Sequence, residues 1–215
     1  MLLAAAPTIP YLRVPRLWPE STIVCVGSGP SLVPEDLETC QHHPTRPRAI
    51  VINDSWCLAP FADVLYACDA TWWARQRGVP DFHGLKYSID PRAARWPDVQ
   101  ILRETGQCGL ETSSDGLRTG SNSGYQAINL AVHLGARRIL LLGYDMRAAQ
   151  GRDHWFGSHP DRQQPPFALF LRLFPTIVAP LAQLGVTVLN CSRSTALHCF
   201  PRVDLEDALR GEGSA

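Results

Sequence analysis

A short run of glycine and serine residues follows the first apolar segment of the chain. There the sequence reads Gly-Ser-Gly-Pro-Ser, directly after Ile-Val-Cys-Val. Glycine lets the backbone turn sharply and approach a ligand, and proline suits the first turn of a helix, where free N–H groups attract anions. We therefore predict that Gly27, Ser28, Gly29, Pro30 and Ser31 bind a phosphate, although a plain tight turn explains them equally well. The spacing matches neither G-x-G-x-x-G nor a P-loop, which disfavours NAD and P-loop kinase functions.

Polar residues also follow three later apolar runs. In chain order they are Asn53, Asp54, Asp69, Tyr144 and Asp145. If the runs are parallel strands, their carboxyl ends meet at one edge of the sheet. That edge would also hold residues 27–31, which we call the glycine loop. Polar residues after strands are often only turn formers or helix caps, but several of them on one edge favour a binding site.

A second loop rich in glycine and serine opens the clearest helix of the sequence. Arg118 supplies a positive charge, and Ser121, Asn122, Ser123 and Gly124 lead into the helical repeat. The free amides and the dipole of a helix start attract anions, so this loop is a second candidate phosphate site. A capped helix with a flexible lead-in explains the same residues equally well.

Two histidines flank an aromatic segment that contains a glycine. His154 and His159 lie on either side of Trp-Phe-Gly-Ser. A histidine is a natural general base near neutral pH, and the aromatic and glycine residues are typical of a loop over a pocket. A lone histidine is more often structural. His154, His159 and, at a nearby strand end, Asp145 are the candidate catalytic residues.

The segment after the last apolar run is polar as well. Asn190, Ser192, Arg193 and Ser194 follow that run and would reach the same edge of the sheet. Arg193 is thus a candidate phosphate-binding cation. Alternatively, Ser192 or Ser194 caps a following helix.

Seven short apolar segments predict the strands that position these residues. They are residues 23–26, 49–52, 64–68, 85–89, 99–102, 139–142 and 186–189, with 85–89 the weakest of them. Continuous apolar runs are typical of strands covered on both faces, as in parallel sheets.

Helices are expected between these strands. Ser123–Leu134 is the clearest helix, and Gly135 should end it. A second helix over residues 167–184 contains Pro175 and Pro180, which predict a kink or a break. The alternation predicts a single α/β domain with a Rossmann-like, doubly wound, mostly parallel sheet of about six to seven strands.

The composition fits one globular domain. The 215 residues are 45% hydrophobic with zero formal net charge, so the global charge demands neither nucleic acid nor a membrane as partner. We expect an N-terminal arm at residues 1–20, one nucleotide-binding, transferase-like domain at 21–210 and a flexible tail at 211–215. Seven cysteines without a C-x-x-C pair suit reduced thiols in the cytoplasm. No apolar run reaches the length of a membrane span.

An ordered set of motifs resembles a known family. It reads V-x-V-G-S-G-P-S-L, I-x-I-N-D-S, Y-A-C-D, S-G-Y-Q-A-I-N-L-A-x-x-L-G-A-x-x-I-x-L-L-G-Y-D and H-W-F-G-x-H-P. The set looks like the MptE-like group (domain of unknown function 115), over about residues 23–209. It is also similar to the bacterial sialyltransferases that share the G-x-G-P-S-L opening. Small members of this kind are carried by phages and prophages.

The sialyltransferase-like branch transfers a sugar from a cytidine nucleotide. The resemblance implies that the glycine loop holds phosphate, that Asn53, Ser123 and Gly124 contact the nucleotide, and that a histidine is the base. That branch has two histidines four residues apart, whereas here they are five apart; His159 is preferred over His154. The tyrosines that relieve charge on the leaving phosphate have no counterpart after Asp145, so Arg147 or Arg152 would take their place. The acceptor would be a hydroxymethylated DNA base or a host glycan.

The MptE branch implies a different reaction. It transfers pyrophosphate from ATP to a pterin alcohol with magnesium, for which Asp54, Asp69 and Asp145 would be the oxygen ligands. We find no H-G-D-N motif of that branch in the chain.

Three hypotheses follow for the function. A nucleotide-sugar-dependent glycosyltransferase is the first, and a magnesium-dependent pyrophosphokinase or related phosphotransferase is the second. The third is a non-catalytic nucleotide- or protein-binding phage factor. Each is expected in the cytoplasm, which is that of the host if a phage encodes the chain.

Overall fold

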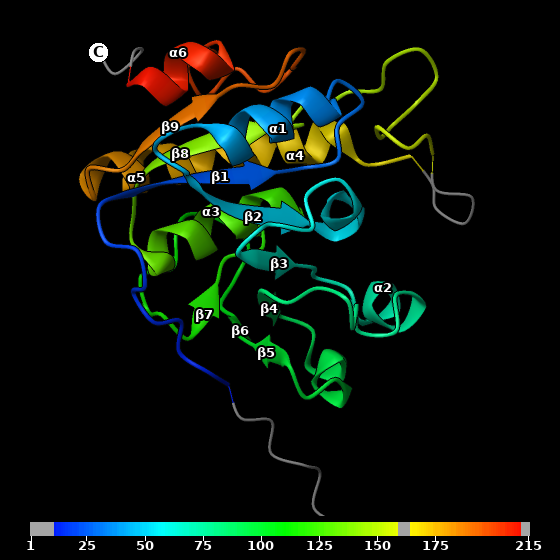
Figure 1. Ribbon diagram of the computed structural model, residues 1–215. Coiled ribbons are helices and arrows are strands. Elements are labelled where there is room, and N and C mark those ends of the chain that lie inside the picture. The colour runs from blue at the N-terminus through cyan, green and yellow to red at the C-terminus, as the bar shows by residue number, and fades with distance from the viewer. Residues whose placement is uncertain (1–10, 159–163, 212–215) are drawn as a thin grey trace, which may run out of the picture.

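Seven parallel strands form the central sheet of the protein (Figure 1). The computed structural model describes residues 11–158 and 164–211. The strands are β1 (Ser21–Val26), β2 (Arg48–Ile52), β3 (Val64–Tyr66), β4 (Leu85–Ser88), β5 (Val99–Ile101), β8 (Ala136–Leu142) and β9 (Thr187–Asn190). They lie in the order β5-β4-β3-β2-β1-β8-β9, and each neighbouring pair is parallel. The sheet and its flanking helices confirm the predicted Rossmann-like α/β fold.

Alternate residues of each strand enter different hydrophobic cores, one on each face of the sheet. In β1, Ile23 and Cys25 belong to the first core, whereas Val24 and Val26 belong to the second. Side chains of a strand alternate between its two faces, and here both faces are covered. This explains why the strand sequences are continuously apolar rather than alternating.

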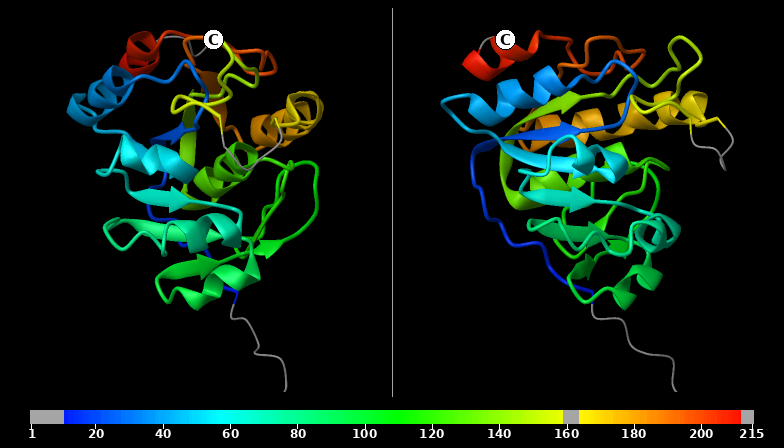
Figure 2. Two further views of the ribbon diagram at one scale, coloured as in Figure 1. Left: turned by 90° about the vertical axis from the view of Figure 1, so that its right-hand side faces the viewer. Right: turned by 45° about the vertical axis from the view of Figure 1, so that its right-hand side comes forward.

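Helices cover both faces of the sheet (Figure 2). The first core includes side chains of α3 (Ser123–Leu134), α4 (Phe167–Leu173), the 3-10 turn η3 (Phe174–Ile177) and α5 (Val178–Gln183). The second core includes side chains of α1 (Pro34–His42), α2 (Ala70–Arg75) and α6 (Leu205–Arg210), and two further 3-10 turns, η1 (Asn53–Cys57) and η2 (Pro91–Arg95), pack on it. The predicted helix Ser123–Leu134 is confirmed, and it ends at Gly135, whose φ of 108° is left-handed.

The predicted helix over residues 167–184 is broken at its centre. Pro175 lies in η3, which separates α4 from α5. Because proline donates no hydrogen bond and clashes with the preceding turn, the α-helix cannot run through this position. The expected kink or break is therefore confirmed.

The prediction that Pro30 occupies the first turn of a helix is wrong. The helix begins four residues later, at Pro34. Residues 30 and 31 instead form a turn, in which the Leu32 amide donates to the Gly29 carbonyl at 3.1 Å. The cause is a long-range partner: Ser31 is bonded to Asp145, which holds the chain in this turn.

The N-terminal arm and a small insertion complete the fold. Amides of Leu12, Val14 and Trp18 donate to carbonyls of Ile101, Ser114 and Leu134, which ties the arm to the body. Two short parallel strands, β6 (Arg103–Glu104) and β7 (Gly116–Leu117), lie between β5 and α3 in the sequence.

Two further features bear on the sequence predictions. Among the described residues, no helix is long and apolar enough to cross a membrane. All seven cysteines are free thiols; Cys25, Cys40 and Cys191 are buried, whereas Cys57 and Cys108 are exposed.

Candidate functional site

A cavity of about 430 Å³ opens at the carboxyl ends of the strands. The chain order of the sheet reverses between β1 and β8, which are neighbours although α1 to α3 separate them in the sequence. The loops that leave β1 and β8 therefore diverge to opposite faces and leave a crevice, as the general rule for open α/β sheets predicts. The left view of Figure 2 looks onto this edge, where the loop after β8 crosses the end of the sheet.

Most of the predicted site residues line this one cavity. They are Gly27, Ser28, Gly29, Asn53, Asp54, Asp69, Ser121, Asn122, Ser123, Gly124, Tyr144, Asp145, Arg147 and His154. Five others lie elsewhere, namely Pro30, Ser31, Arg118, Arg152 and Arg193. His159, the preferred base, falls outside the described residues.

The glycine loop packs directly on the loop after β8. The Gly27 amide donates to the Leu142 carbonyl and the Gly29 amide to the Gly143 carbonyl, both at 2.8 Å. A Cβ on Gly27 would lie 2.7 Å from the Gly143 carbonyl oxygen, and a Cβ on Gly29 would lie 2.1 Å from Asp145 Oδ1. The two glycines are thus required for loop packing, and their amides are already used within the protein.

Asp145 joins the two loops. The Ser31 amide donates to Asp145 Oδ2 at 2.9 Å, and the Ser31 hydroxyl donates to Oδ1 at 2.8 Å. The residue is only 1% exposed, and burial raises the pKa of its carboxyl to about 6, although the bonds from Ser31 and the nearby Arg147 oppose this shift. Asp145 was a candidate catalytic residue, but these contacts give its carboxylate a structural task.

The start of α3 forms a second wall. Asn122 is the N-cap, because its Oδ1 accepts from the amides of Gly124 at 2.7 Å and Tyr125 at 3.2 Å. The capped helix start that the sequence offered as one reading of this loop is therefore present. Gly124 packs against the Tyr144 ring, whose hydroxyl donates to the Gly124 carbonyl at 3.0 Å. Tyr144 is thereby a buried wall residue rather than a free ligand donor.

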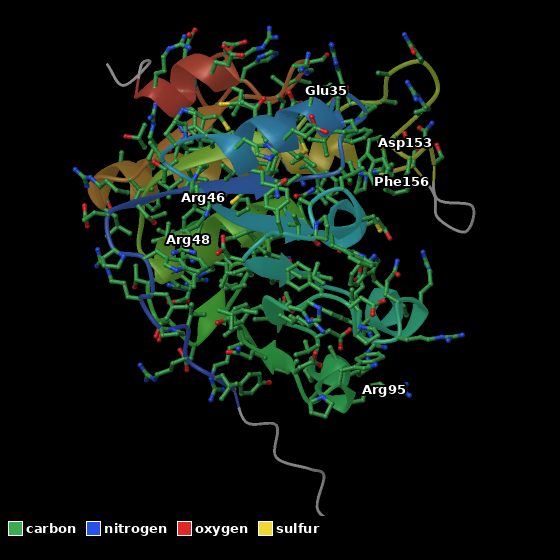
Figure 3. All side chains as sticks on the ribbon, viewed as in Figure 1. Glu35, Arg46, Arg48, Arg95, Asp153 and Phe156 are labelled. Atoms are coloured by element: carbon green, nitrogen blue, oxygen red, sulfur yellow. The ribbon has the colours of Figure 1, made fainter. Side chains whose placement is uncertain are left out.

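His154 is held over the cavity by the glycine loop. Its Nδ1 lies 2.9 Å from Ser28 Oγ, and the amide of the next residue, Trp155, donates to the Ser28 carbonyl at 3.0 Å. The ring of Phe156 stacks on the imidazole, with centroids 5.0 Å apart and planes at 12°. Asp153 and Phe156 lie on the same loop, which joins β8 to α4 (Figure 3).

Two tight turns make this loop rigid. Ala149 and Arg152 exchange both backbone hydrogen bonds, at 2.9 and 3.0 Å, across Gln150 and Gly151, whose positive φ values are typical of two-residue hairpin turns. His154 and Gly157 exchange two more, at 2.9 and 3.0 Å. The position of the imidazole is therefore fixed on both sides by backbone contacts.

Among the described residues, five carboxylates and one arginine line the cavity. The acidic residues are Asp54, Asp69, Glu104, Asp145 and Asp153. Asp54 accepts from Trp72 Nε1 at 3.2 Å and Gln76 Nε2 at 2.8 Å. Arg147 is exposed and bonded to the Ser194 hydroxyl. Within the described ranges, no three His, Cys, Asp or Glu side chains form a group that could hold a metal ion. The predicted carboxylates share the cavity, and their role as magnesium ligands stays a prediction.

The other predicted cations face elsewhere. Arg118 Nη1 donates to the Thr105 carbonyl at 2.5 Å and pairs with Glu111 at 3.6 Å. Arg193 makes an ion pair with Asp36 at 2.9 Å, beside a separate cavity near α6. Arg152 is exposed on its hairpin.

The polar segment after β9 does reach the sheet edge. Ser192 Oγ accepts from the Tyr144 amide at 2.8 Å, and Ser194 contacts Ser31 and Arg147. Neither serine caps a helix, because the N-cap of α6 is Asp204.

Strained backbone lies around the cavity. Asn53, Ser121 and Met146 have φ values of 51°, 52° and 50°, which are uncommon for residues other than glycine. The buried Oδ1 of Asn53 has no hydrogen-bond partner among the described residues. Residues held in this way often mark functional sites, which agrees with the predicted ligand-binding role of Asn53.

Sequence reasoning missed one wall and several polar residues of the cavity, among them Glu104, Gln126 and Asp153. The wall is apolar and consists of Met146, Pro165, Pro166, Phe167 and Phe170. Glu104 comes from β6, which is too short to give a periodic signal. Gln126 accepts from the Tyr66 hydroxyl at 2.7 Å and donates to the Thr119 carbonyl at 2.9 Å. Gln126 is an amide among the apolar residues of α3, and a polar residue in such a position indicates a specific hydrogen-bonding role that the sequence could have revealed.

Comparisons with known proteins give no match. Neither family models, nor curated proteins, nor solved structures match this chain. The resemblance to the MptE-like group and to bacterial sialyltransferases therefore stays a prediction from the motifs.

Proposed function

We propose that this protein is a glycosyltransferase that uses a nucleotide sugar and His154 as its general base. One observation carries the proposal: His154 and the glycine loop line one cavity where the chain order reverses between β1 and β8. They are joined by the 2.9 Å contact between Ser28 Oγ and His154 Nδ1. Ligands of open α/β sheets bind at this point. Placing a base within hydrogen-bond reach of the phosphate loop suits group transfer from a nucleotide.

The charges around the cavity favour a donor with a single phosphate. The five carboxylates and one arginine that line it among the described residues leave little positive potential for a polyphosphate. Arg147 and the N-terminal end of α3, a helix of 12 residues, would neutralise one negative charge. A nucleoside-monophosphate sugar, of which a cytidine donor is the example given by the motif resemblance, matches this balance best.

The reaction is a displacement at the anomeric carbon. His154 takes the proton of an acceptor hydroxyl, the acceptor oxygen bonds to the anomeric carbon, and the bond to the phosphate oxygen breaks with its electron pair on the phosphate. The apolar wall around Phe167 and Phe170 would exclude water from the donor sugar. The acceptor would be a hydroxymethylated DNA base or a glycan. We assign the base to His154 because it lines the cavity.

A donor screen with a histidine variant tests this proposal. The wild-type protein is offered nucleotide sugars, and release of the nucleotide is followed with and without acceptors. His154→Ala should lower kcat about 10²- to 10⁴-fold, while the nucleotide affinity measured by calorimetry stays within about twofold. His42→Ala, which changes an exposed histidine of α1, is the matched control and should behave as wild type. Failure of the wild-type protein to consume any nucleotide sugar would sink the proposal.

A magnesium-dependent pyrophosphokinase is the second candidate. The carboxylates that line the cavity favour it, although they form no metal-binding group of three within the described residues. Nucleotide binding that is lost in EDTA and restored by magnesium would support this candidate. Metal-indifferent binding of a cytidine monophosphate would support glycosyl transfer.

A further inference from the structure

The Ser28 hydroxyl is the group of the glycine loop that can contact both a bound anion and the imidazole of His154. The amides of Gly27, Gly29 and Ser31 donate to other groups of the chain, and Pro30 has no amide proton. Among the described residues, the amide of Ser28 donates to no other group, and its hydroxyl contacts only His154. An anion on this loop must therefore be bound through Ser28.

The hydroxyl of Ser28 has one proton to give, and the direction of that proton determines whether Nδ1 of His154 accepts or donates in their contact. If the hydroxyl donates to Nδ1, that nitrogen carries the lone pair and Nε2 carries the ring proton. If the hydroxyl donates to an anion, its oxygen is free to accept a hydrogen bond from Nδ1–H, and Nε2 then carries the lone pair. Only the second tautomer has a base at Nε2.

We propose that Ser28 is a positioning residue that sets the tautomer of His154 according to whether the glycine loop holds a phosphate. Without an anion, the hydroxyl donates to Nδ1. With a phosphate bound, the chain of bonds runs from Nδ1–H to Oγ and from Oγ–H to a phosphate oxygen. Nε2 then takes the proton of the acceptor hydroxyl, which yields an imidazolium with a proton on each nitrogen. This inference rests on the proposed function, because it uses His154 as the base.

The surrounding contacts keep the two residues in place whichever way the proton points. The Trp155 amide donates to the Ser28 carbonyl, and the two backbone hydrogen bonds between His154 and Gly157 close the turn behind the imidazole. None of these contacts involves the Ser28 hydroxyl. Ser28→Ala therefore removes the hydroxyl that links the phosphate to Nδ1, which we call the relay, while the backbone contacts that position His154 remain.

NMR of the full chain with ¹⁵N-labelled histidine tests the proposal directly. Long-range proton–nitrogen spectra distinguish the two tautomers, His154→Gln assigns the signal, and inorganic phosphate is the probe. Phosphate should convert His154 of the wild-type protein from the Nε2–H to the Nδ1–H form. In Ser28→Ala the tautomer should not respond, and kcat should fall about 10- to 100-fold. Ser158→Ala, which removes a hydroxyl of the same loop that donates to Asp153, is the matched control and should respond as wild type.

The outcomes separate this proposal from the proposed function. A tautomer that phosphate leaves unchanged in the wild-type protein, or an equal response in Ser28→Ala, would overturn the relay even if sugar transfer is observed. A phosphate-driven change that depends on Ser28 would support the relay even if no nucleotide sugar is consumed, and in that case glycosyl transfer alone would fail.

Discussion

Asp145 is the residue on which the glycine loop, the end of β8 and the cavity meet. Its two oxygens accept from the Ser31 amide and hydroxyl, and Gly29 is a glycine because Asp145 fills the space that a Cβ would need. Burial raises the pKa of this carboxyl to about 6. The folded protein therefore bears the cost of a buried charge at neutral pH in order to hold the two loops together.

The raised pKa of Asp145 predicts a specific dependence of stability on pH. Between about pH 4 and pH 6 the native state keeps a proton that the unfolded chain has lost, so the free energy of unfolding falls as pH rises through this range. Asp145→Asn keeps the acceptor for the Ser31 amide and removes the charge. Its free energy of unfolding relative to wild type should rise by about 3 kcal/mol from pH 4 to pH 7.

Urea unfolding at several pH values measures this difference. Asp81→Asn, at an exposed position, is the control and should leave the difference from wild type constant over the same range. If Asp145→Asn also shows a constant difference, the carboxyl titrates normally in the folded protein and the burial argument is wrong.

The residue types of the glycine loop were predictable, but the reason for them was not. The sequence shows that Gly27 and Gly29 follow a strand, and the cavity confirms their position. Their lack of a side chain, however, is required by Gly143 and Asp145, which are more than a hundred residues away along the chain. A local pattern contains no information on such a partner.

The start of α3 is the element that points its positive end at the cavity. Asn122 caps it, and Ser123 and Gly124 line the cavity. If a phosphate lies there, a negative charge at the cap should repel it, whereas a neutral cap should not. Comparing a negative with a neutral cap residue therefore separates the structural role of the cap from its electrostatic effect on a ligand.

Two substitutions of Asn122 test the electrostatic role of this helix start. Aspartate and serine are both good N-caps, so Asn122→Asp and Asn122→Ser should each change the free energy of unfolding by less than about 0.5 kcal/mol. Only Asn122→Asp adds a charge, and it should weaken binding of cytidine monophosphate about tenfold, as measured by calorimetry. Equal affinities of the two variants would show that the phosphate does not lie at this helix.

Elements were predictable where burial is local and regular. The strands were identified because both faces of each are covered. The break around Pro175 was identified because proline disrupts the interior of a longer helix. The start of α1 was placed four residues early, because the turn at Pro30 depends on the distant contact between Ser31 and Asp145.

The topology of the whole sheet explains how the site could be located. Residues after parallel strands converge on one edge in any sheet of this order, so the predicted positions after β1, β2, β3 and β8 met in one cavity. The direction of each arginine side chain depends on its partner. Arg193 pairs with Asp36 and therefore does not line the cavity as predicted. The wall around Phe167 depends on where α4 is placed relative to the strand ends, and the helical repeat of its sequence does not determine that placement.

The charge around the cavity predicts how the protein ranks its nucleotides. Each added phosphate brings negative charge to a cavity whose described residues include five carboxylates and one arginine. Without divalent metal, affinity should therefore fall in the order cytidine mono-, di- and triphosphate, by about threefold or more at each step. Calorimetry in EDTA measures the order, and Arg147→Gln should weaken all three nucleotides, because the arginine faces the cavity. A triphosphate that binds most tightly, and only with magnesium, would contradict the order and favour pyrophosphate transfer.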